Sequence, residues 1–109
     1  MAYDRELADR TRATLKGSKG LVEKRMFGGL CFLLNGNILV GVWKNSLIVR
    51  VGIDHYDSAL REPFTREFNV TGHAMKGWVM VDLDGLDDAQ ALKDWIDKAK
   101  TFVSKLPKK

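Results

Sequence analysis

The chain has 109 residues, of which 45% are hydrophobic and 29% are charged, and its formal net charge is +4. This length fits one domain with its own hydrophobic core, and the balance of apolar and charged residues excludes a disordered chain. The single cysteine, Cys31, excludes a secreted scaffold held by internal disulfides and suits a reducing cytosol.

The positive charge is concentrated at the C-terminus, where Lys105, Lys108 and Lys109 leave the rest of the chain almost neutral. Within that remainder, the charged residues of segment 10–25 are mostly basic and those of segment 82–97 mostly acidic. The two segments could pair within one molecule, pair two molecules, or lie on separate solvated faces, and we expect the last. With no apolar leader and no long apolar run, we expect a cytoplasmic protein that does not associate with membranes.

The first half of the chain predicts one helix and then a run of short strands. Apolar residues at helical spacing predict a helix over residues 3–16, ended by Gly17. Asn35-Gly36 between two apolar runs is a strong hairpin signal, and Gly28-Gly29 and Lys44-Asn45 are also turn residues. The expected strands are residues 21–27, 30–34, 38–43 and 46–51.

The second half is less regular. Asp54, with Asp57 at capping-box spacing, predicts the start of a short helix over 54–61, and Pro63 prevents its continuation. Residues 64–77 show no sustained period, so we expect a loop with a short extended piece at 67–70. A strand at 78–83 and a long helix with an apolar stripe from Ala89 to Leu106 complete the chain.

This order predicts an α+β fold in two layers: an antiparallel meander of about five strands, with the N- and C-terminal helices packed on it. Two-residue turns cannot join parallel neighbours, which excludes a doubly wound nucleotide-binding fold. We expect one domain over residues 1–109, with residues 105–109 as a frayed basic tail. The residues expected to serve as structural turns are Gly28, Gly29, Asn35, Gly36, Gly52 and Gly77.

The residues predict no catalytic, cofactor or metal site. Gly28-Gly29 could cradle a phosphate, but the pair leads into a strand where such a cradle needs a helix N-terminus, so a turn is favoured. Cys31 could act as a nucleophile with His55 or His73, yet its place in an apolar strand favours a buried structural thiol. The aspartates of residues 82–88 resemble a calcium loop, but the glutamate that ends such a loop is missing, and a strand exit followed by a helix cap is favoured.

Basic and aromatic residues near the ends of the predicted strands form the candidate partner-binding set. Such side chains suit contact with nucleic acid or with protein. The alternative is that both tryptophans anchor the core and the bases are merely solvated. The set comprises Arg25, Arg50, Lys76, Trp43 and Trp78.

Four motifs share the order and spacing of a known family: Met26-Phe27-Gly28-Gly29, Asn35-Gly36-Asn37, Arg50-Val51-Gly52 and Met75-Lys76-Gly77-Trp78-Val79. On these motifs the chain resembles the N-terminal domain of the TfoX (Sxy) family of bacterial competence regulators. The resemblance covers nearly the whole chain. It implies a fold similar to that of secretion chaperones, often self-associating, with no catalytic residues. In the full-length regulators a C-terminal domain follows, and the protein is a coactivator of competence genes alongside a cyclic-AMP receptor protein.

We therefore expect a non-enzymatic regulatory or interaction module, related to coactivators of competence (DNA uptake), that acts through protein contacts as a homodimer. Its protein partner could belong to the transcription machinery. The alternative is direct nucleic-acid binding by the basic segment from Arg10 to Arg25 and the lysine tail. A third class, a small-molecule enzyme, would require a deep pocket that holds a strongly shifted ionisable group.

Overall fold

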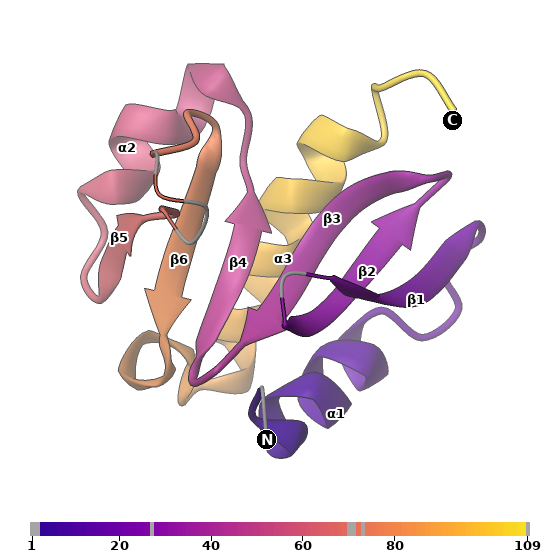
Figure 1. Ribbon diagram of the computed structural model, residues 1–109, viewed down its shortest axis with the longest axis horizontal. Helices are drawn as coiled ribbons and strands as arrows, with labels where there is room; N and C mark the ends of the chain where they lie inside the picture. Colours follow the sequence, from indigo (N-terminus) through magenta and orange to yellow (C-terminus); the bar gives the residue numbers. More distant parts are fainter. Residues whose placement is uncertain (1–2, 27, 70–71, 73, 109) are drawn as a thin grey trace.

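The computed structural model describes residues 3–26, 28–69, 72 and 74–108. These residues form one antiparallel sheet in the order β1-β2-β3-β4-β6-β5, with the α-helices on one of its faces (Figure 1). The elements are α1 (Arg5–Thr14), β1 (Leu21–Met26), β2 (Gly29–Leu34), β3 (Asn37–Trp43), β4 (Ser46–Arg50), α2 (Tyr56–Leu60), β5 (Thr65–Glu67), β6 (Trp78–Asp82) and α3 (Ala89–Val103). Short 3₁₀ helices at Ile53–His55 and Leu83–Leu86 precede α2 and follow β6.

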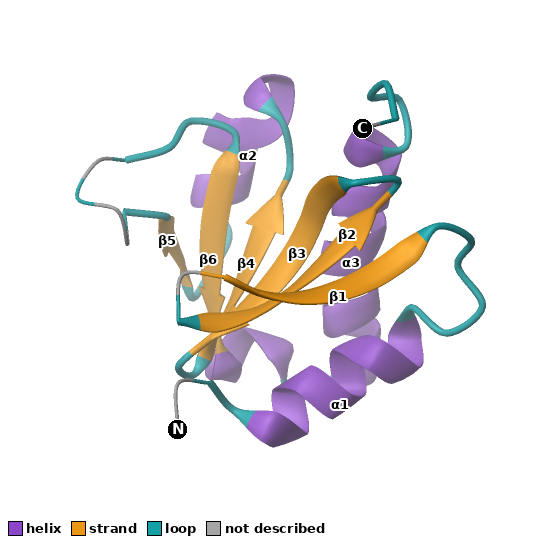
Figure 2. Cartoon of the chain, turned by 45° about the vertical axis from the view of Figure 1, so that its right-hand side comes forward, coloured by secondary structure: helices purple, strands orange, loops and turns teal. Residues whose placement is uncertain are grey.

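The main core lies between the sheet and the helices (Figure 2). Successive residues of a strand point to opposite faces, so Leu47 and Val49 of β4 enter this core while Ile48 belongs to a cluster on the other face. The apolar stripe of α3 and the buried residues of α1 and α2 cover the inward side. The predicted α+β fold in two layers is confirmed, with six strands where about five were expected.

A β-bulge in β3 sets which side chains reach each face. The pairing of β2 with β3 shifts between Phe32 and Leu33, so that Phe32 pairs with Val40 and Leu33 with Ile38. Leu39 is therefore an extra residue, and both Leu39 and Val40 enter the main core. The shift also places Trp43 on the same face as Ile38.

The hairpin between β2 and β3 has the predicted turn. Asn35 and Gly36 have φ values of 53° and 85°, the doubly positive pattern of a two-residue type I′ turn. Gly28 also has positive φ, at 76°, as a turn requires. Gly29 is instead the first residue of β2, where an added Cβ would lie 2.3 Å from the carbonyl oxygen of Val42.

Gly52 and Gly77 meet where β4 ends and β6 begins. Their φ values are 87° and 92°, and the backbone amides of Val51 and Gly52 both donate to the carbonyl of Gly77. A Cβ on Gly52 would lie 2.5 Å from the ring of Phe102. Both residues therefore need the freedom of glycine.

Several predicted boundaries were wrong. The extended piece is Thr65–Glu67, which pairs with β6; it begins two residues before the predicted 67–70, and of the described residues in that range it includes Glu67 but not Phe68 or Asn69. Asp54 does not cap the short helix, because the N-cap positions are Gly52 and His55 and neither receives a side-chain hydrogen bond. Helix α3 ends at Val103, although Leu106 still packs against the core. Phe27, Val70 and His73 of the predictions lie outside the described residues.

In the described part of the chain, the basic and acidic segments form their ion pairs separately. Among the described residues, no ion pair joins residues 10–25 to residues 82–97. Arg12 contacts Asp9 and Glu23, both close to it in the chain, and Arg10 donates to the backbone carbonyl of Leu86. Between these two segments, the described contact of a charged side chain is therefore the hydrogen bond from Arg10 to a backbone carbonyl, and not an ion pair.

Candidate functional site

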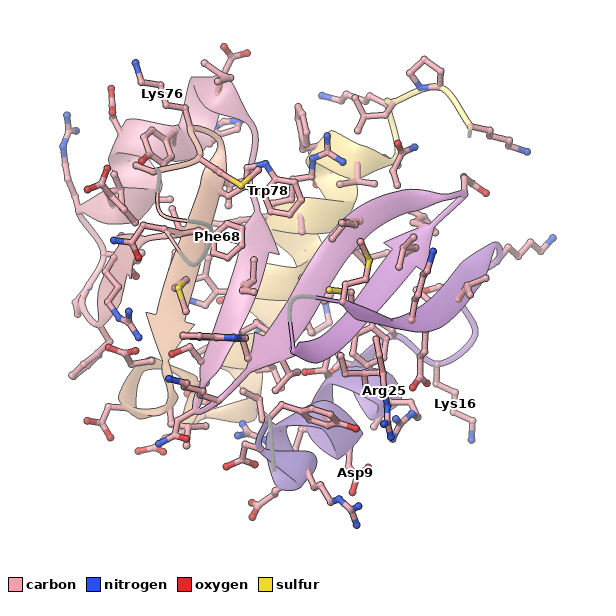
Figure 3. All side chains as sticks on the ribbon, in the orientation of Figure 1. Asp9, Lys16, Arg25, Phe68, Lys76 and Trp78 are labelled. Carbon is pink, nitrogen blue, oxygen red and sulfur yellow. The ribbon has the colours of Figure 1, made fainter. Side chains whose placement is uncertain are left out.

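The sheet face opposite the helices carries a second, smaller apolar cluster. Ile48, Met80 and Phe68 are buried there, and the half-buried Trp43, Met75 and Trp78 pack against them. Phe68 and Trp78 both lie on the viewer's side of the sheet in Figure 3, with α3 behind it. We call this surface the helix-free face. An apolar and aromatic surface without a covering helix is typical of interaction sites.

Arg50 and Trp78 come together on this face. They are direct partners in the register of β4 with β6, and the Arg50 guanidinium lies 4.9 Å from the Trp78 ring centroid. The ring of Phe102, near the end of α3, lies 5.7 Å from the same guanidinium. Burial lowers the pKa of Arg50, because this position disfavours the charged form.

Trp43 and Lys76 border the same face. The ammonium of Lys44 lies 4.6 Å from the Trp43 ring centroid, a cation–π contact. Lys76 lies in the connection that leads into β6, at the upper edge of the sheet in Figure 3. Four of the five candidate residues predicted from the sequence therefore lie on or beside the helix-free face, namely Arg50, Lys76, Trp43 and Trp78.

Arg25 does not join them. It pairs with Leu30, whose side chain enters the main core, so Arg25 belongs to the helix side of β1. Figure 3 shows it near α1, in the neighbourhood of Lys16 and far from Trp78. The neighbouring residue Lys24 pairs with Cys31 and belongs to the opposite face. The predicted set is therefore split between the two faces of the sheet.

A polar network that sequence reasoning missed lies at one end of the helix-free face. Arg66 donates to Asp82, at 3.0 Å, and to the hydroxyl of Ser46, which in turn donates to Asp82. The hydrogen bonds from Arg66 hold the pKa of Asp82 below its usual range, despite partial burial. These residues line a hollow of about 520 Å³. Only the pairing of β5 with β6 brings Arg66 to this place, and no local sequence signal predicts that pairing.

This network is unsuited to acid–base catalysis. A general base that works near neutral pH needs a pKa near that pH, whereas Asp82 is held ionised by Arg66 and is a weaker base than a free carboxylate. The contacts fit a structural role, because they tie β5 and β4 to β6.

Cys31 is buried in β2, as predicted, and faces Gly41 of β3. An added Cβ on Gly41 would lie 3.1 Å from the Cys31 sulfur, so the thiol fills the space that this glycine leaves. Burial raises the pKa of Cys31, the opposite of what an activated nucleophile needs. His55 is exposed beside α2, on the helix side. Within the described residues, no cluster of three or more histidine, cysteine, aspartate or glutamate side chains is arranged to hold a metal ion.

The basic N-terminal segment does not form one continuous surface. The guanidinium of Arg12 donates two hydrogen bonds to Glu23, at 2.6 and 2.7 Å, which lowers the pKa of that carboxyl. Arg10 is engaged with Leu86. The remaining bases of the segment, Lys16, Lys19, Lys24 and Arg25, lie in the connection to β1 and on both faces of β1. A phosphate backbone would meet only some of them at once.

No helix in the described part of the chain combines the length and apolar character needed to cross a membrane. No match to the chain is found among curated proteins or among solved structures. A family model described as the TfoX N-terminal domain matches residues 13–103, which is most of the chain. This agrees with the four sequence motifs and their order along β1 to β6. The chain belongs to the TfoX N-terminal domain family.

Proposed function

We propose that the protein is a non-enzymatic regulatory module that binds a protein partner through its helix-free face. The observation that carries this proposal is the one-sided placement of the helices. They cover the main core and leave Trp43, Met75 and Trp78 half-buried on the other side. Aromatic residues, methionine and arginine are the types enriched where proteins meet.

The family supports a regulatory role, since the TfoX N-terminal domain is linked to the control of competence. The partner would belong to the transcription machinery, and the module would work in the cytoplasm as a homodimer. Direct nucleic-acid binding by the basic segment and the lysine tail is the second candidate, and part of the basic segment is already occupied by contacts within the chain. There, Arg12 is already paired with Glu23 and Arg10 with a backbone carbonyl.

Two neighbouring residues of β1 provide a matched test. Lys24 and Arg25 are both exposed and basic, yet the register assigns them to opposite faces. A photo-crosslinking amino acid, p-benzoylphenylalanine, would replace each in turn, and the chain would be irradiated in its native cells. We expect a discrete crosslink to a second protein from position 24 and none from position 25. Equal crosslinking from both positions, or from 25 alone, would contradict a docking site on the helix-free face.

A further inference from the structure

Arg50 is a half-buried cation without an acidic partner. None of the ion pairs among the described residues includes it. Among the described residues, the Arg50 guanidinium donates a hydrogen bond to the backbone carbonyl of Ile38, at 3.5 Å, which is the outer limit for such a bond. A guanidinium carries five N–H donors, so most of those of Arg50 have no protein acceptor. In the described part of the chain, every buried side-chain nitrogen or oxygen has a hydrogen-bond partner, so the remaining donors of Arg50 lie at the surface, where another molecule can reach them.

The aromatic neighbours determine what can reach this cation. Trp78 and Phe102 lie against the guanidinium at 4.9 and 5.7 Å. A guanidinium with two rings beside it can be approached by another molecule only from its remaining sides. Its planar fork of N–H donors matches the two oxygens of a carboxylate.

The charges on the helix-free face indicate the sign of the partner. The described bases on this face are Lys24, Lys44, Arg50 and Arg66, and Lys76 borders it. Of the described acids, Asp82 is paired with Arg66, and Asp84 lines the same hollow at one end of the face. The bases outnumber the acids, so an acidic partner would meet complementary charge around Arg50.

We infer that Arg50 receives the carboxylate of an acidic residue in a partner protein, and that apolar neighbours of this residue pack on Trp43, Met75 and Trp78. The inference rests on the proposed function and specifies the chemistry of its partner as an acidic segment with apolar flanks. Base stacking by single-stranded nucleic acid needs a free ring face, whereas Trp78 already contacts both Arg50 and Phe68.

A selection from displayed random peptides tests this inference on the full chain. Peptides enriched on the immobilised protein would be synthesised with each acidic residue intact or replaced by its amide. Binding would be measured at about 150 mM salt, where interactions between exposed charges are screened beyond about 8 Å. The variants would be Arg50→Gln, Arg50→Lys, which keeps the charge but loses the planar fork, and Arg61→Gln, which removes an exposed charge after α2.

We expect the enriched peptides to combine an acidic residue with apolar neighbours. The amide replacement should weaken their binding to the wild type by roughly tenfold or more, as for a hot-spot contact. Arg50→Gln and Arg50→Lys should weaken binding similarly and remove the effect of the amide, whereas Arg61→Gln should bind as the wild type does. Unchanged circular dichroism and urea midpoints would verify that each variant folds.

The inference about Arg50 would be wrong if the peptides bind Arg50→Gln as tightly as the wild type, or if their acidic residues can be replaced without loss of binding. Either result would still be consistent with a docking site on the helix-free face. Oligothymidylate that binds at the same salt and loses affinity in Arg50→Gln would overturn it in favour of nucleic acid. A selection that enriches no peptide would count against the proposed docking face as well as against Arg50.

Discussion

Replacing Gly52 by alanine should destabilise the protein strongly, for two separate reasons. Its φ of 87° and ψ of 160° lie in a region that only glycine occupies readily, at a cost of about 1–3 kcal/mol for other residues. The new Cβ would also lie 2.5 Å from the ring of Phe102, and overpacking of this kind costs about 1–3 kcal/mol. We therefore expect the free energy of unfolding to fall by about 3–4 kcal/mol, a large part of a total of about 5–15 kcal/mol.

Gly17 provides the matched control. Its φ is 88°, but an added Cβ would meet nothing within 4 Å, so Gly17→Ala should cost only about 1–2 kcal/mol of backbone strain. Urea denaturation followed by far-ultraviolet circular dichroism would measure both variants. The double variant with Phe102→Ala isolates the clash, since Gly52→Ala should cost about 1–2 kcal/mol less once the ring is gone. If Gly52→Ala and Gly17→Ala cost the same, or if Phe102→Ala brings no relief, the steric argument is wrong.

Three further predictions concern charge, burial and assembly. The pKa of Asp82 is lowered in the folded state by Arg66. The stability it contributes is thus present above the unfolded pKa near 3.8 and lost as the pH falls through the lower folded value. Because both side chains are about half exposed, the Arg66–Asp82 pair contributes less than about 1 kcal/mol to the free energy of unfolding. The urea midpoint should fall as the pH is lowered from about 5 to about 2. Asp82→Asn should make this fall smaller, whereas Asp84→Asn should not. The buried Cys31, with its raised pKa, should react with Ellman's reagent about a hundredfold more slowly than a cysteine placed at Val22, which is 59% exposed; equal rates would contradict the burial. Sedimentation velocity at tens of micromolar should give the mass of a homodimer, and a monomer there would rule this assembly out.

Local chemistry accounts for the parts of the fold that were predicted correctly. Asn35 and Gly36 tolerate positive φ and lie between two apolar runs, so the hairpin can be read from a few adjacent residues. The stripe of α3 repeats at helical spacing over four turns, which no strand would produce. The meander follows because two-residue turns leave its strands no other arrangement.

The errors have a common cause in contacts between distant segments. β5 has only three residues and joins the sheet by pairing with β6. The irregular sequence between the two strands does not predict this pairing. The bulge at Leu39 lets two successive residues enter the main core, so simple alternation along β3 would assign Trp43 to the wrong face. Asp54 has the sequence of a helix cap, but the chain turns at Gly52, where the backbone packs on Gly77.

The sequence by itself determined the class of the fold, the meander, the buried thiol and the family, because each depends on periodicity, turn residues or motifs that are local in the chain. It also supplied the basic and aromatic residues of the candidate site. Only the tertiary structure decided which of them act together. Strand register and the bulge in β3 bring Arg50, Trp78 and Trp43 to the helix-free face, and the same register turns Arg25 to the helix side. A side chain's face depends on how its strand pairs with a distant partner, and no local pattern encodes that pairing.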